Sequence, residues 1–167
     1  TMKKLFILGL LTLSLVGCGA KVAPVTITIT PVGNEMKFEQ TQFEVQKGQE
    51  VTIIMNNTAT MEMMKHNVVI LNDASKVAEV GMAAMSVAGY VPEHAAIIAA
   101  TAIAEPGQQT KVTFIAPKKV GTYTYICTFP GPFMAMKGEM IASAWVTRRI
   151  FSFLGSLPPP RPKSSLI

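Results

Sequence analysis

The sequence predicts an all-β fold, a β-sandwich of short strands with one helical insert. Three observations lead to this prediction. Residues 25–30 (VTITIT) alternate strictly between apolar residues and Thr, which is the pattern of a half-buried strand. Turns rich in Gly, Pro and Lys, such as 47–49 and 117–121, separate several segments of this kind. Residues 72–89 instead carry apolar residues at helical spacing.

The expected strands share alternating or continuous apolar residues, and turn-forming residues bound them. In chain order they cover residues 25–30, 36–45, 51–55, 66–71, 109–116, 122–128 and 139–146. Segment 66–71 (HNVVIL) is nearly all apolar, so we expect it to be buried. A series of short strands separated by turns is typical of a β-sandwich.

The insert is rich in Ala, Val and Met. Asp73 and Ser75 are both suited to cap the start of a helix. The face of this helix that we expect to be buried consists of Val77, Val80, Gly81 and Ala84. We expect a second short helix within residues 92–100.

The N-terminus has the features of an export signal. Lys3 and Lys4 precede a mostly apolar run over residues 5–16, which is too short for an ordinary membrane span. The run ends in LVGC at residues 15–18. This ending resembles the lipobox of bacterial lipoproteins, in which the cysteine is acylated. A plain signal peptide is the alternative.

From this ending we expect a lipoprotein signal peptide over residues 1–17, acylation of Cys18 and a short tether over 18–24. The protein would then be exported and attached to a membrane of the bacterial cell envelope through the lipid on Cys18. It would face the periplasm or the extracellular side.

The net charge of +5 describes the ends of the chain rather than its body. Of the fifteen Lys and Arg residues, two lie in the signal and four in the tail, so residues 18–147 hold nine against ten Asp and Glu. This balance argues against a basic face for nucleic acid. We expect one domain over residues 25–147. The basic, Pro-rich segment 148–167 lacks strand alternation, and we expect it to be disordered.

Three side chains form a soft donor set. His66 begins a strand that we expect to be buried, Cys127 ends another strand, and Met136 follows nine residues later. An imidazole, a thiolate and a thioether together suit copper, and especially Cu(I). If Cys18 carries lipid, Cys127 has no cysteine partner, which calls for an explanation. The alternatives are a hydrogen-bonded histidine and an inert buried thiol.

Three motifs make the resemblance to a family specific. They are KHN at residues 65–67, YICTFPG at 125–131 and MAMKG at 134–138. Together with the insert, they resemble the azurin and auracyanin branch of the cupredoxins over residues 25–146. The resemblance implies a Greek-key β-sandwich and one type 1 blue copper ion that carries single electrons. It also implies that His66, Cys127 and Met136 are copper ligands.

One position departs from the family pattern. The family has a second His ligand five residues after the Cys, where this sequence has Pro132. Proline offers no side-chain donor, so the ligand set is incomplete. Three explanations are open. The first is a sequence error or damaged copy, since His and Pro codons differ by one base, and the second is divergence to a Cu(I)-binding or metal-free protein. The third is a replacement ligand, for which His94 is the only other histidine.

Two further groups of residues surround the expected site. Asn67 and Thr128 are placed to link the two ligand segments and to support the sulfur, although ordinary loop hydrogen bonding is the alternative. Six methionines crowd two loops that we expect the fold to place near one end: Met61, Met63, Met64, Met134, Met136 and Met140. We favour an apolar patch, extended by Phe133, on which redox partner proteins dock. A rim that captures Cu(I) is the alternative.

These features predict a copper-binding electron-transfer protein that is not an enzyme. No Ser-His-acid set, phosphate-binding glycine loop or paired carboxylate signature stands out in the sequence. Two other functions remain open because of Pro132. One is a protein that binds or delivers Cu(I) without electron transfer. The other is a metal-free β-sandwich that serves as a scaffold.

Overall fold

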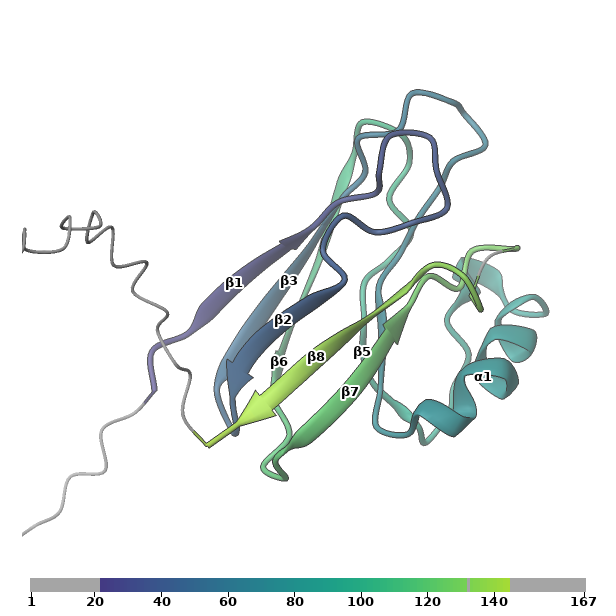
Figure 1. Cartoon of the computed structure of the whole chain (residues 1–167). Helices are drawn as coiled ribbons and strands as arrows, with labels where there is room; N and C mark the ends of the chain where they lie inside the picture. The colour runs from purple at the N-terminus through teal and green to yellow at the C-terminus, as the bar shows by residue number, and fades with distance from the viewer. Residues whose placement is uncertain (1–21, 132, 145–167) are drawn as a thin grey trace, which may run out of the picture.

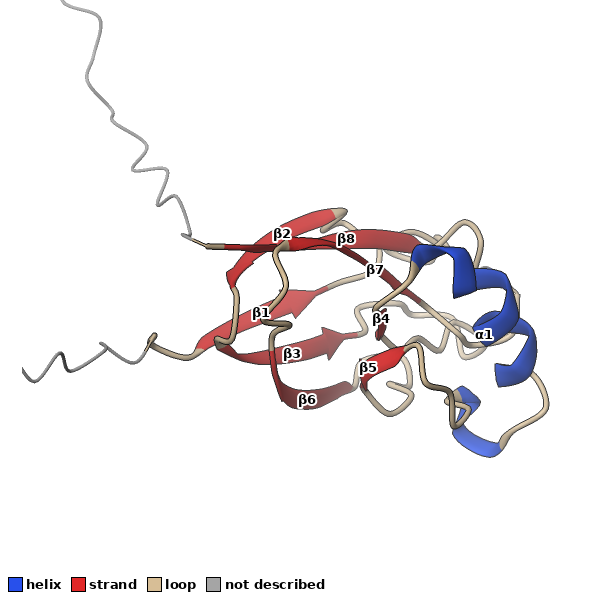
Figure 2. Ribbon diagram, turned by 90° about the horizontal axis from the view of Figure 1, so that it is seen from below, coloured by secondary structure: helices blue, strands red, loops and turns tan. Residues whose placement is uncertain are grey.

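The computed structural model describes residues 22–131 and 133–144. Within these residues, eight strands form two sheets that face each other, and the helical segment lies at one side of the larger sheet (Figure 1, Figure 2). The strands are β1 (Val25–Ile29), β2 (Gln42–Gln46), β3 (Glu50–Asn56), β4 (Val69–Leu71), β5 (Ile97–Ala100), β6 (Gln109–Ile115), β7 (Gly121–Ile126) and β8 (Lys137–Ser143). The helical segment consists of η1 (Ala74–Lys76), α1 (Val77–Ala84) and η2 (Ala88–Tyr90). The expected β-sandwich with a helical insert is confirmed.

The two sheets have simple strand orders. The smaller sheet is β1-β3-β6 and the larger is β2-β8-β7-β4-β5. Strand β1 runs parallel to β3 and β2 runs parallel to β8, while the remaining pairs are antiparallel. The pairing of β4 with β7 matters most for function, because it joins the segments that follow His66 and precede Cys127. Within the described part of the chain, no helix is long and apolar enough to cross a membrane.

The larger sheet is covered on both faces where β4 pairs with the end of β7. Ile70 and Tyr125 belong to the core between the two sheets, whereas Val69 and Ile126 pack in a second cluster with the insert. Side chains alternate between the two faces of a strand, so β4 and β7 each contribute to both clusters. All three residues of β4 are therefore buried, as the apolar run in the sequence indicated.

The insert buries the face that its sequence pattern predicts, namely Val77, Val80, Gly81 and Ala84. The Asp73 side chain accepts a hydrogen bond of 2.8 Å from the Ser75 N–H and caps η1, which leads into α1. A Cβ atom at Gly81 would collide with the Phe133 ring. A glycine at this position therefore allows α1 to approach the loop before β8.

Three of the expected elements differ from the structure. The predicted helix within 92–100 is wrong, because 97–100 form β5, which pairs with β4. Its Ile pair suits a strand, and pairing with a neighbouring strand overrides the local pattern. Only the end of 36–45 is a strand, since turns and an isolated bridge between Pro31 and Phe38 precede β2. The expected strand from 66 to 71 begins at Val69, and His66 forms an isolated bridge with Ala104.

Several predictions lie outside the described residues. These are the signal peptide, Cys18, most of the tether, Pro132 and the tail over 148–167.

Candidate metal centre

The structure brings the His66 and Cys127 side chains together. The Nδ1 atom of His66 lies 3.7 Å from the Sγ atom of Cys127, although the residues are 61 positions apart. His66 is 2% exposed and Cys127 is fully buried. The register of β4 and β7 accounts for the meeting, because Val69 pairs with Ile126, which directly precedes Cys127.

Met136 lies beside Cys127 in the fold. It directly precedes β8 and is fully buried. The Cys127 N–H donates a hydrogen bond of 3.0 Å to the Met136 carbonyl, which continues the pairing of β7 with β8 by one step. The same core cluster contains both residues. The three donors of the expected set therefore come from segments that converge at one end of the larger sheet.

The distance between the nitrogen and the sulfur fits a shared metal ion. A metal bound at about 2.3 Å from a thiolate and about 2.0 Å from an imidazole holds these atoms about 3.7 Å apart when the bond angle is about 120°. The soft donors favour copper over a hard cation. Among the described residues, no group of three or more His, Cys, Asp and Glu side chains gathers in a way that could hold a metal. A metal bound at this site would therefore depend on the imidazole of His66, the thiolate of Cys127 and the thioether of Met136 together.

Burial controls the protonation of both donors. Desolvation raises the pKa of the Cys127 thiol, and the N–H groups of Asn67 and Phe129, which hydrogen-bond the sulfur, oppose this rise. Desolvation also lowers the pKa of His66, which keeps the imidazole neutral and its lone pair available. A metal that binds here must displace the thiol proton.

The imidazole of His66 retains one unused polar atom. Its Nε2 atom is buried and has no hydrogen-bond partner among the described residues. The His66 backbone is held firmly, since its N–H and carbonyl exchange hydrogen bonds of 3.2 and 2.8 Å with Ala104. The position of the ring is therefore set by the backbone bridge and by packing.

Asn67 and Thr128 join the two segments that carry the donors. The Asn67 Nδ2 atom donates to Thr128 Oγ1, and the Thr128 N–H donates to Asn67 Oδ1, both at 2.8 Å. Both side chains are fully buried. These reciprocal bonds fix the residues that directly follow His66 and Cys127. The Asn67 N–H also serves the sulfur, so one residue links both donor segments.

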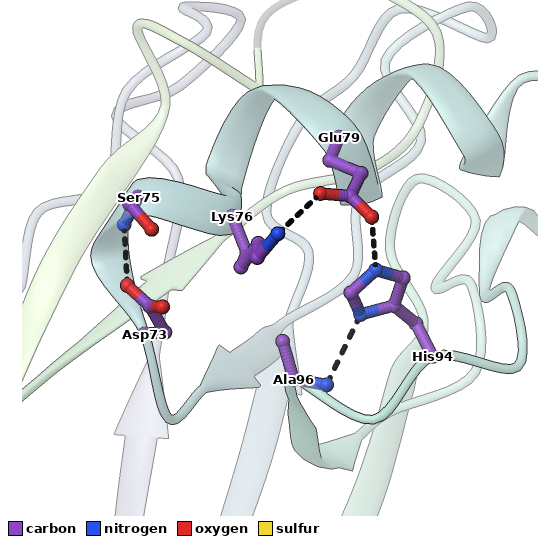
Figure 3. Close-up of polar contacts among 6 residues, drawn as sticks. All are labelled: Asp73, Ser75, Lys76, Glu79, His94 and Ala96. Atoms are coloured by element: carbon purple, nitrogen blue, oxygen red, sulfur yellow. Dashed lines mark hydrogen bonds and ion pairs between the residues drawn. The ribbon is translucent and has the colours of Figure 1, made fainter.

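His94 does not replace the missing second histidine. Its Nε2 atom lies 3.0 Å from Glu79 Oε1, and its Nδ1 atom accepts a hydrogen bond of 3.0 Å from the Ala96 N–H (Figure 3). Both ring nitrogens are thus engaged on the insert. The Glu79 carboxylate also binds Lys76 at 2.8 Å, and the hydrogen bonds from His94 and Lys76 lower the pKa of Glu79 to about 2.

The methionines divide into two groups. Met61, Met63 and Met134 are exposed, whereas Met64, Met136 and Met140 are buried. The expected apolar patch of six methionines therefore needs correction, because three of them are part of the protein interior. Sequence reasoning missed Met36, which is also exposed and whose terminal methyl group lies near Gly131 in the loop after Cys127.

Sequence reasoning also missed two backbone groups near the candidate site, one at the Cys127 sulfur and one at the Thr128 hydroxyl. Phe129 contributes its backbone N–H to Cys127, and Tyr90 contributes its carbonyl to the Thr128 hydroxyl. Backbone groups leave no signature in a sequence, so no pattern could have identified them.

The fold is a two-sheet β-sandwich. It buries an imidazole and a thiol within reach of one metal ion, and a buried thioether lies in the next segment. Together these features define a protein of the cupredoxin class. The model of a family described as copper binding proteins, plastocyanin/azurin family, matches residues 25–143. The chain therefore belongs to this family, in its azurin and auracyanin branch. Proteins of this class bind copper and carry electrons, and they are generally not enzymes.

Individual relatives agree with this membership. Auracyanin-A of Chloroflexus aurantiacus is 36% identical over 125 residues, which are 72% of this chain and 75% of that protein. Azurin-1 of Alcaligenes xylosoxydans xylosoxydans is 33% identical over 117 residues, which are 65% of this chain and 91% of that protein.

Solved structures agree as well. The structure of auracyanin A, a "blue" copper protein from Chloroflexus aurantiacus, gives a TM-score of 0.66 at 34% identity and covers 72% of this chain and 99% of its own. The dithionite-reduced auracyanin of Roseiflexus castenholzii gives a TM-score of 0.64 at 35% identity. The match covers 71% of this chain and 96% of that chain.

Proposed function

We propose that this protein carries single electrons on one copper ion held by Cys127, His66 and Met136. The observation that supports the proposal is the 3.7 Å separation of His66 Nδ1 and Cys127 Sγ in a buried setting. Copper would supply the one-electron chemistry, and Cys127 would bind it as thiolate, His66 through nitrogen and Met136 through its thioether as a weak ligand.

The chain's own contribution is rigidity and exclusion of water. His66 is tied to Ala104 by two backbone hydrogen bonds, and the Cys127 N–H is tied to the Met136 carbonyl. Donors that cannot move hold one geometry in both oxidation states, which lowers the rearrangement that electron transfer requires. The N–H groups at the sulfur partly compensate a thiolate that burial alone would disfavour.

The sequence supplies no side-chain donor at Pro132, so we propose a copper site with three protein ligands. One nitrogen and two sulfurs favour Cu(I) over Cu(II) relative to a set with two imidazoles. We expect the site to differ from an ordinary blue copper centre for this reason.

We further propose that the protein works in the bacterial cell envelope, anchored by lipid on Cys18, and that it is not an enzyme. Redox partner proteins would dock on the apolar end of the molecule. The support for this surface is the exposure of Met36, Met61, Met63 and Met134. Methionine suits a surface that must fit more than one partner.

A second candidate function is the binding and delivery of Cu(I) without electron transfer. Two observations favour it: the missing donor at Pro132 and the exposed methionines, whose thioethers bind Cu(I).

Visible spectroscopy and voltammetry of the copper-loaded full chain separate these functions. An electron carrier should show an intense thiolate-to-copper band that disappears and returns through reversible reduction, and Cys127→Ser should abolish it. Tight Cu(I) binding without a reversible Cu(II) state would support delivery instead. A chain that binds neither ion would overturn both proposals and leave a metal-free scaffold.

A further inference from the structure

Tyr90 has an unusual backbone conformation for its residue type. It ends η2 with φ of 57°, and it is the only residue other than Gly with positive φ in the described ranges 22–131 and 133–144. This region is unfavourable for a bulky L-residue because Cβ approaches the backbone. Gly89, directly before it, also has positive φ. A second glycine would satisfy the same turn without strain, so the Tyr90 side chain calls for another explanation.

The contacts of Tyr90 lead to the segment after Cys127. The Thr128 hydroxyl donates a hydrogen bond to the Tyr90 carbonyl. The Tyr90 ring meets the Phe129 ring edge to face, with centroids 5.1 Å apart and planes at 76°. Such aromatic pairs stabilise a contact beyond the area that they bury. The insert therefore holds the two residues that directly follow Cys127.

These two residues govern the surroundings of the sulfur. The Phe129 N–H hydrogen-bonds Cys127 Sγ, and the Thr128 hydroxyl lies between Asn67 Nδ2 and the Tyr90 carbonyl. Hydrogen bonds to a ligand sulfur set its electron density, and with it the properties of a bound metal. A shift of the Phe129 backbone would change the direction of its N–H relative to the sulfur.

We propose that Tyr90 is a positioning residue for the metal centre, which holds Thr128 and Phe129 so that the Phe129 N–H stays directed at the Cys127 sulfur. The functional significance of this role rests on the proposed copper function. The arrangement itself is present in the chain without metal. The strained turn at Tyr90 is thus explained by the ring that it delivers to Phe129.

Hydrogen exchange of the metal-free full chain tests the positioning directly. Tyr90→Gly removes the ring and relieves the positive φ, so any loss of order cannot come from added backbone strain. We expect exchange at the Phe129 amide to accelerate by about threefold to tenfold, as the loss of one aromatic pair implies. Tyr90→Phe keeps the ring and should exchange as the native chain does. The β3 and β6 amides report overall stability and should be unchanged in both variants.

Unchanged exchange at Phe129 in Tyr90→Gly would overturn the proposal. Equal acceleration in β3 and β6 would also overturn it, because Tyr90 would then contribute to stability throughout the sandwich. The copper-loaded chain gives a second readout. The thiolate-to-copper band should shift in Tyr90→Gly and not in Tyr90→Phe. A native chain without that band would contradict the proposed copper function while leaving the exchange result to decide the role of Tyr90.

Discussion

Asn67 and Thr128 exchange two hydrogen bonds of 2.8 Å across 61 residues of chain, and each directly follows a residue that we propose to bind copper. The first prediction concerns this pair. Thr128→Val keeps the shape of the side chain but leaves the Asn67 amide without its buried acceptor. We expect a loss of about 1–3 kcal/mol in the free energy of unfolding, measured by urea denaturation of the metal-free chain.

A surface threonine provides the matched control for that variant. The Thr113 hydroxyl shares a hydrogen bond of 2.8 Å with Thr52 on the exposed side of the smaller sheet. Thr113→Val should change stability by less than about 0.5 kcal/mol. Equal effects of the two variants would show that the pair of Asn67 and Thr128 has no special structural role.

The second prediction concerns Pro132. The resemblance to the family assigns this position to the second histidine ligand, so Pro132→His should complete the donor set. We expect the thiolate-to-copper band of the Cu(II)-loaded chain to appear or to strengthen, as recorded by visible absorption. If the variant stayed colourless with copper bound elsewhere, our alignment of this loop with the family would be wrong.

The third prediction concerns pH. Burial lowers the pKa of His66 below its ordinary 6.5, so the unfolded chain takes up a proton that the folded chain does not. The free energy of unfolding is therefore not reduced by this histidine above pH about 6.5. Below that pH it falls by up to about 1.4 kcal/mol per pH unit. Denaturation of the metal-free chain between pH 7 and about pH 5 measures this slope.

Two histidine variants separate the source of that slope. His66→Gln should reduce it, whereas His94→Gln, which keeps His66, should retain it. The Glu79 carboxyl titrates lower, between its ordinary 4.5 and about 2, and so does not contribute in this range. A slope that survives His66→Gln unchanged would assign the pH dependence to another group.

The fourth prediction concerns the contact of the insert with the loop before β8. Gly81→Ala would gain about 1 kcal/mol of helix propensity on an exposed face, but here its methyl group meets the Phe133 ring. Overpacking typically costs about 1–3 kcal/mol, so we expect a net loss of stability in thermal denaturation. Gly121→Ala is the control, because its Cβ would have no neighbour closer than 4.0 Å. A stabilised Gly81→Ala would show that the ring yields readily.

Local patterns in the sequence predicted the elements that depend on local forces. The period of the insert identified the buried face of α1, and the alternation in 25–30 identified β1. The prediction of a short helix within residues 92–100 was wrong because β5 forms by pairing with β4, which no local pattern reports. The start of β4 was misplaced for the same reason, since the bridge of His66 to Ala104 is a tertiary contact.

The sequence predicted the side-chain donors of the candidate site but not the backbone groups around them. The donor types and their family spacing pointed to His66, Cys127 and Met136. Two further contacts of the site could not be predicted, because the Phe129 N–H at the sulfur and the Tyr90 carbonyl at the Thr128 hydroxyl belong to the backbone. The split of the methionines into exposed and buried sets was equally hidden, since it depends on the path of each loop.

X-ray absorption at the copper edge tests the central claim most directly. For the copper-loaded full chain we expect one sulfur at about 2.3 Å and one imidazole nitrogen at about 2.0 Å, with Cys127→Ser losing the sulfur and His66→Gln losing the imidazole. Copper surrounded only by nitrogen and oxygen, with no change in either variant, would contradict the site proposed at Cys127 and His66.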